Sequence, residues 1–155
     1  MRIMGIDYGD KRIGIAMSDP MGWTAQGIET VLNGGNPGLS ALKRIAAIAF
    51  EYKAETIVVG YPRNMNGSSG GRAEKTDIFI NRLEKIIFET YAGVKPAVMV
   101  KWDERLSSVA ANRTMTEIGV RTSRKKGIVD QIAAAHILQG YLDNIRIKNA
   151  GGEKA

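Results

Sequence analysis

The chain has 155 residues, enough for one domain with its own core. Apolar and charged residues make up 44% and 25% of it, as in ordinary globular proteins, and the absence of cysteine excludes disulfides, thiolate metal sites and a cysteine nucleophile. The net charge of +6 favours polyanionic partners such as nucleic acids. Met1 leads directly into an apolar strand, and no apolar run approaches the roughly 18 residues of a membrane span, so we expect a cytoplasmic location.

Three antiparallel strands are predicted in the first part of the chain. Residues 2–7 and 12–18 are apolar stretches joined by a turn over residues 8–11 that contains Gly and Asp, which is typical of a hairpin. A third short strand is expected within residues 26–31, before the Gly-, Asn- and Pro-containing break at residues 33–38. The three strands form a meander.

Helices and strands alternate in the rest of the chain. Apolar residues recur at helical spacing from Leu39 to Phe50, and the β-branched run Thr56–Val59 follows as a buried strand. A mobile loop is predicted over residues 63–71, and a helix carrying Phe79, Leu83, Ile86 and Ile87 follows it. The fifth strand is predicted over residues 97–102 and a short helix over residues 107–118. A basic loop over residues 121–127 then leads into a last helix over residues 128–147.

This order of elements predicts an α/β fold with a mixed five-stranded sheet, in which three antiparallel strands precede the alternating helices and strands. Helices are expected on both faces of the sheet, because the crossovers between parallel strands place helices there. We assign residues 1–148 to a single domain and residues 149–155 to a flexible tail.

Acidic residues stand at the ends of three predicted elements. Asp7 closes the first strand, where an ionised carboxylate is costly to bury unless it meets water, a partner or a metal. Asp103 and Glu104 close the fifth strand, and because successive strand side chains point to opposite faces, we favour Glu104 as the acid that shares a cleft with Asp7. Asp130 lies at the start of the last helix.

Each of these acids also has an ordinary structural explanation. An aspartate at a strand end commonly opens a turn, adjacent acids pair locally with Arg105, and an aspartate near a helix start stabilises the exposed amides. Three acids from separate segments nevertheless predict a convergent site for Mg²⁺ or Mn²⁺, hard ions that prefer oxygen ligands. The single histidine, His136, lies in an apolar run of the predicted last helix. A lone histidine in such a run is more often a packed helix residue than a metal ligand.

Basic and polar residues in or beside the predicted loops are candidates for holding the phosphates of a nucleic acid. The strand ending at Gly60, for example, leads into a loop equipped with Arg, Asn and Ser donors. The candidates are Lys11, Arg12, Arg63, Asn64, Arg72, Arg105 and Lys126.

Four segments resemble, in order and spacing, the motifs of the YqgF/RuvX-type family. They are residues 7–14 (Asp-Tyr-Gly-Asp-Lys-Arg-Ile-Gly), residues 58–67 (Val-Val-Gly-Tyr-Pro-Arg-Asn-Met-Asn-Gly), residues 103–107 (Asp-Glu-Arg-Leu-Ser) and residues 126–130 (Lys-Gly-Ile-Val-Asp). The resemblance spans essentially the whole chain. One departure is Tyr61, where leucine is expected.

This resemblance implies an RNase H-like fold and a nuclease that matures the 5′ end of pre-16S ribosomal RNA, with an older assignment as a Holliday-junction resolvase. Asp7, Glu104 and Asp130 occupy the positions of the family's acidic set, with Asp103 beside them as a further candidate ligand. The implied chemistry is phosphodiester hydrolysis assisted by Mg²⁺ or Mn²⁺. The implied partners are pre-rRNA or branched DNA, and ribosomal precursor particles. We expect no membrane partner, and the protein to be a monomer or a homodimer.

Two other interpretations stay open. The hairpin at Asp7 also resembles the phosphate-binding turn of actin-like and sugar-kinase ATPases, although those proteins clamp a nucleotide between two related domains and this chain supplies one. The second alternative is an RNA- or ribosome-binding protein without catalysis, in which the basic loops contact RNA. Because phosphate contacts carry no base information, the sequence does not choose between RNA and branched DNA.

Overall fold

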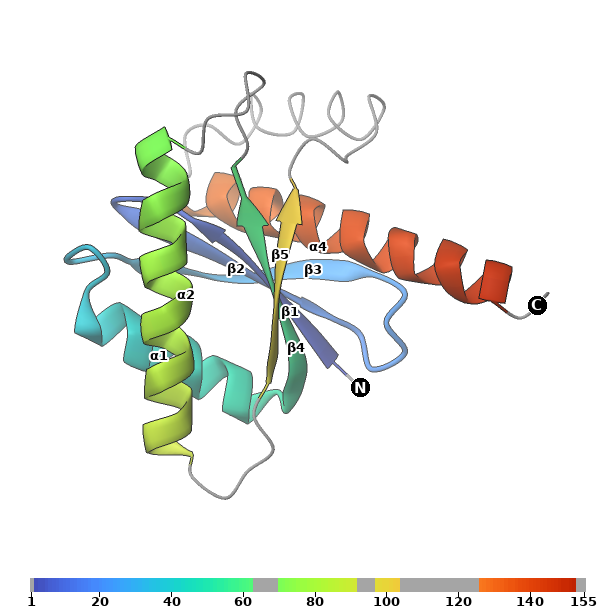
Figure 1. The fold of residues 1–155 in the computed structure, drawn as a ribbon, viewed down its shortest axis with the longest axis horizontal. Coiled ribbons are helices and arrows are strands. Elements are labelled where there is room, and N and C mark those ends of the chain that lie inside the picture. Colours follow the sequence, from blue (N-terminus) through green and yellow to red (C-terminus); the bar gives the residue numbers. More distant parts are fainter. Residues whose placement is uncertain (1, 63–69, 92–96, 104–125, 153–155) are drawn as a thin grey trace.

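The computed structural model describes residues 2–62, 70–91, 97–103 and 126–152 (Figure 1). The strands are β1 (Arg2–Tyr8), β2 (Arg12–Ser18), β3 (Ala25–Leu32), β4 (Ala54–Tyr61) and β5 (Val98–Asp103), and the helices are α1 (Leu39–Glu51), α2 (Gly70–Thr90) and α4 (Lys126–Gly152). None of these helices is long and apolar enough to cross a membrane.

The five strands form one mixed sheet in the order β3-β2-β1-β4-β5. β1 lies at the centre, antiparallel to β2 and parallel to β4, while β3 adds antiparallel to β2 and β5 adds parallel to β4. This arrangement confirms the predicted meander followed by parallel strands. It also brings the carboxyl ends of β1, β4 and β5 to one edge of the sheet, beside the starts of α2 and α4 (Figure 1).

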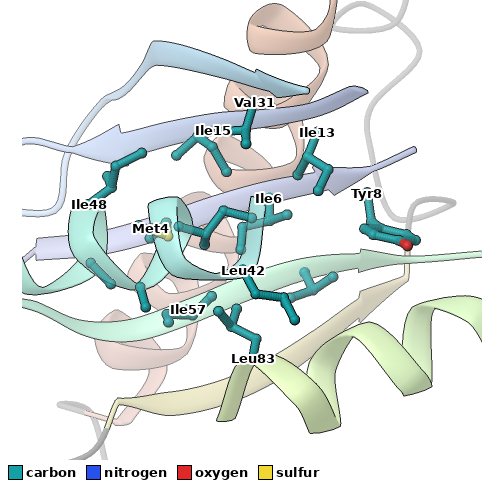
Figure 2. Packing of buried hydrophobic residues seen from close by; sticks show 14 of the residues in the cluster. Met4, Ile6, Tyr8, Ile13, Ile15, Val31, Leu42, Ile48, Ile57 and Leu83 are labelled. Atoms are coloured by element: carbon teal, nitrogen blue, oxygen red, sulfur yellow. The ribbon is translucent and has the colours of Figure 1, made fainter. Parts of the chain in front are cut away.

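Helices cover both faces of the sheet, as predicted (Figure 1). On one face, α1 and α2 pack on the larger core, whose centre includes Met4, Ile6 and Ile57 (Figure 2). On the other face, α4 packs on a smaller core that includes Ile3, Val58 and Leu138. Neighbouring residues of β1 and β4 belong to different cores, because strand side chains alternate between faces.

Three element boundaries differ from the prediction. α2 begins at Gly70, within the segment predicted as a loop through residue 71, and α4 begins at Lys126, within the predicted basic loop. α4 also continues to Gly152, beyond the predicted end of the last helix at residue 147. The glycines at these ends suggested loops, but once a helix is nucleated each added residue costs little. The helix predicted over residues 107–118 lies outside the described residues.

The sheet meets α4 at unusually short range, where glycines stand on three adjacent strands. A Cβ placed on Gly14 of β2 would lie 2.0 Å from the carbonyl oxygen of Asp130, and one on Gly5 of β1 would lie 2.6 Å from Cβ of Leu138. A Cβ on Gly27 of β3 would lie 2.7 Å from Cβ of Gln131. The helix backbone therefore lies against the sheet itself, at a depth that no larger residue permits.

We predict that Gly14→Ala destabilises the protein by about 3 kcal/mol or more, since the added methyl meets helix backbone rather than a flexible side chain. Gly34→Ala is the matched control, because a Cβ at Gly34 has nothing within 4 Å, and it should leave stability unchanged or slightly raised. Urea denaturation of the two variants and the parent measures both changes. Equal stability for Gly14→Ala and the parent would contradict the close approach of α4.

Candidate active site

Asp7 is half-buried near the carboxyl end of β1, on the face of the sheet covered by α4. Its neighbours Ile6 and Tyr8 both belong to the core beneath α1 and α2, so alternation along the strand turns Asp7 to the opposite face. Its partner in the antiparallel register is Gly14 of β2. Residues directly opposite one another in such a pair have their Cβ positions on the same face, about 5 Å apart.

The close approach at Gly14 brings the backbone of Asp130 to the strand that pairs with Asp7. The backbone of Asp130 occupies the space where a Gly14 side chain would stand, with its Cα 3.2 Å from that Cβ position. Because Gly14 lies opposite Asp7, the backbone of Asp130 lies on the same face of the sheet as Asp7, although the two residues are far apart in the chain. That their carboxylates converge on one metal ion stays a prediction.

Asp130 is held by Arg12, the first residue of β2. Arg12 Nε donates a hydrogen bond to Asp130 Oδ2 at 2.8 Å, and the two side chains are 38% and 21% exposed. At this exposure the pair contributes about 1 kcal/mol at most to stability, but a charge-assisted bond fixes the direction of the carboxylate. Arg12, predicted to contact phosphate, therefore also orients a predicted metal ligand.

Asp103 is the last residue of β5, and the directions of the two residues before it indicate its face of the sheet. Trp102 belongs to the core beneath α4, where it packs edge-on against Tyr141, while Lys101 reaches the other way to Asp77 of α2. Asp103 follows Trp102, so alternation places it on the α2 side with Lys101, away from Asp7. Glu104 lies outside the described residues, and the prediction that it joins Asp7 stays a prediction that this alternation favours.

The predicted phosphate-binding residues are described only in part. Lys11, in the turn between β1 and β2, and Arg72, in the first turn of α2, are exposed. Lys126 is the first residue of α4. Arg63, Asn64 and Arg105 lie outside the described residues, as does the side chain of Lys126.

One polar network beside the site was missed by the sequence analysis. Asp77 of α2 accepts a hydrogen bond from the Tyr61 hydroxyl at 2.9 Å and pairs with Lys101 Nζ at 2.7 Å. The Lys101 ammonium holds the pKa of Asp77 below its ordinary value, helped by the Tyr61 hydroxyl, and Asp77 in turn raises the pKa of Lys101. The network joins the carboxyl ends of β4 and β5 to α2, and it uses Tyr61, the residue that departs from the family pattern.

The described residues include no group of three acidic or histidine side chains placed to hold a metal ion. Asp7 and Asp130 supply carboxylate oxygens, the ligand type that Mg²⁺ and Mn²⁺ prefer. Their donor chemistry fits such an ion, with a further ligand required from outside the described residues. A separate apolar cavity of about 470 Å³, lined by Phe50, Ile87 and Tyr91 among others, lies at the amino end of β4 and so at the opposite edge of the sheet.

The shape of the molecule is that of known resolvases. RuvC of T. thermophilus, solved in complex with a Holliday junction substrate, matches with a TM-score of 0.59 at 15% identity, over 95% of this chain and 96% of that chain. The Fowlpox virus resolvase, solved in complex with Holliday junction DNA, matches with a TM-score of 0.54 at 10% identity, over 94% and 99% of the two chains. Such low identities establish the fold alone, and the RNase H-like α/β fold predicted from the sequence is confirmed.

Sequence relatives define the family within that fold. The model of the RuvX family, described as Holliday junction resolvase, matches residues 1–144. An Acetivibrio thermocellus protein named "Putative pre-16S rRNA nuclease" is 54% identical over 144 residues, 93% of this chain and 96% of its own. A Ruminiclostridium cellulolyticum protein of the same name is 49% identical over 155 residues, 100% of both chains. The chain belongs to the RuvX family.

His136 gives the fold a specific pH dependence. The ring is half-buried on α4, and burial lowers its pKa below the ordinary value of 6.5. As the pH falls through about 6.5, the unfolded chain therefore takes up a proton that the folded chain resists, and stability is lost. We predict that His136→Leu removes this loss between about pH 7 and pH 5, a window above the titration of the acids. Urea denaturation at several pH values tests it, and parallel pH curves for the two proteins would refute it.

Proposed function

We propose that this protein is a metal-dependent nuclease that hydrolyses phosphodiester bonds, with Asp7, Glu104 and Asp130 as the ligands of Mg²⁺ or Mn²⁺. The observation that carries the proposal is the contact of Gly14 with Asp130, because it brings the backbone of Asp130 to the face of the sheet that also carries Asp7. Carboxylates held close together repel one another, and a bound cation would offset that repulsion. Membership of a family described as resolvases supports the same reaction class.

The chain's own residues have distinct parts in this reaction. Asp7 and Asp130 hold the metal site, and Arg12 fixes the direction in which the Asp130 carboxylate points. Lys11 and Arg72, which are exposed, are proposed to contact the backbone phosphates of a polynucleotide, with Arg63, Asn64, Arg105 and Lys126 acting beside them. When bound at these residues, an ion would supply the chemistry of a metal-activated water and of positive charge near the leaving oxygen.

The proposed physiological substrate is the 5′ end of pre-16S rRNA, met within ribosomal precursor particles. Two relatives that match more than nine-tenths of the chain carry pre-16S rRNA nuclease names. The second candidate is resolution of four-way DNA junctions, favoured by the family description and by the fold shared with junction-bound RuvC. Both substrates are cleaved by the same chemistry, so the choice between them is decided by assay.

We predict that Asp7→Asn and Asp130→Asn each lower cleavage by at least about 100-fold, because each removes an anionic metal ligand while keeping the side-chain shape. Cleavage of pre-16S leader fragments and of four-way junctions, each with Mg²⁺, Mn²⁺ or a chelator, measures the effect. The chelator should abolish cleavage by the parent protein.

Asp143→Asn serves as the control, since Asp143 lies on the same helix as Asp130 but is exposed and pairs with Gln139 and Arg146 of its own helix. It should cleave like the parent. If Asp7→Asn and the parent cut equally, the site assignment is wrong. If the parent binds leader RNA but cuts neither substrate, the non-catalytic RNA-binding alternative replaces the nuclease.

A further inference from the structure

A buried asparagine stands next to the turn that follows Asp7. Asn33 comes directly after β3, in the segment that the sequence identified only as a break, and it is 8% exposed. Its side chain has both a donor and an acceptor, and burying either without a partner costs free energy. The hydrogen-bond partners of the Asn33 side chain therefore show what this residue holds in place.

All of these bonds go to segments at the edge of the candidate site. Asn33 Nδ2 donates to the carbonyl oxygen of Gly9 at 3.0 Å and to the Tyr8 hydroxyl at 3.2 Å. Asn33 Oδ1 accepts from the backbone N–H of Gly38, the cap of α1, at 2.9 Å. The backbone N–H of Asn33 donates to the carbonyl oxygen of Lys11 at 2.9 Å. Asn33 thus bonds to Gly9 and Lys11 on the two sides of the β1–β2 turn, and it links the turn to the start of α1.

The turn itself has little other support from the sheet. The β1–β2 ladder ends at the Tyr8 and Ile13 pair, so residues 9–11 lie beyond its register. On the α2 side, the Tyr8 ring stacks on Phe79 with centroids 4.4 Å apart, and Figure 2 shows Tyr8 at the end of the core. Asn33 supplies the buried polar contacts of the turn, and the Tyr8–Phe79 stack supplies the apolar one. An exposed ion pair between Asp10 and Lys75 of α2, at 3.3 Å, is a further attachment.

We propose that Asn33 is a positioning residue, which fixes the turn over residues 8–11 and through it the directions of the Asp7 carboxylate and the Lys11 side chain. The inference rests on the proposed function, in which Asp7 binds the metal and Lys11 contacts phosphate. Two residues bonded to Asn33, Tyr8 and Gly9, follow Asp7 directly, so a shift of the turn moves the carboxylate. Metal and phosphate geometry tolerates errors of only about 0.5 Å.

The test compares Asn33→Ala with Ser18→Ala in the full chain. Ser18 is the matched control because it is also a buried polar residue, 1% exposed, whose Oγ accepts from the backbone N–H of Ile3 at 2.8 Å and donates to the carbonyl oxygen of Asp19 at 3.0 Å. It therefore ties the same two strands together, but at their other end. Both variants should lose thermal stability.

Two readouts separate positioning from stability. Hydrogen exchange of the amides of residues 9–12 should accelerate by about 10-fold or more in Asn33→Ala and remain at the parent rate in Ser18→Ala. The dissociation constant for Mn²⁺, measured by calorimetry without substrate, should rise about 10-fold in Asn33→Ala alone, as when a supporting hydrogen bond behind a metal ligand is removed. Asn33→Asp, which keeps the acceptor for Gly38 but loses the Nδ2 donors, should accelerate exchange in the same turn.

The outcomes for the two proposals differ. Unchanged exchange at residues 9–12 in Asn33→Ala, or equal changes in Ser18→Ala, overturns the positioning role whatever the catalytic result. Faster exchange with unchanged Mn²⁺ affinity also overturns it, because the turn then moves without moving the ligand. If the parent protein neither binds Mn²⁺ nor cleaves, the proposed function fails, while faster exchange still shows that Asn33 holds the turn.

Discussion

The depth to which α4 sinks into the sheet is the constraint on which the rest of the structure depends. Gly14 has no side chain, so the first part of the helix touches β2 through its backbone, and Asp130 arrives beside the strand that carries Asp7. Arg12 then bonds the Asp130 carboxylate from the same strand. A larger residue at Gly14 would lift the helix and separate the two acids. Packing and chemistry are thus set by the same contact.

The elements of the fold could be predicted because their signals are local. Alternation of side chains along β5 also predicts that only one of the adjacent acids shares the face of Asp7, and the observed directions of Lys101 and Trp102 favour the α2 face for Asp103. The helix ends were predicted less well, because glycines such as Gly70 and Gly127 are typical of loops. In the structure both glycines belong to the first turn of a helix. Such a conflict is decided by packing, which a local pattern does not contain.

The polar contacts of the site could not be predicted, because their partners are distant in sequence. Asn33 lies in a run typical of any turn, and nothing in that run indicates that its amide binds Gly9, 24 residues earlier. Arg12 and Asp130 are 118 residues apart. The Tyr61 hydroxyl likewise meets Asp77 only because α2 crosses the ends of β4 and β5. The sequence identifies each candidate residue by its type. The residue that it contacts is identified only by the structure.

The assembly of this centre from the two ends of the chain has a consequence for biosynthesis. The sheet strands and Asp7 are made first, whereas Asp130 is made with α4, after all five strands. A partly synthesised chain therefore carries Asp7 without Asp130 and leaves the α4 face of the sheet uncovered. If the centre cleaves polynucleotides, it does so only after α4 has docked, so a nascent chain beside the ribosome's own RNA is harmless until its last helix has folded.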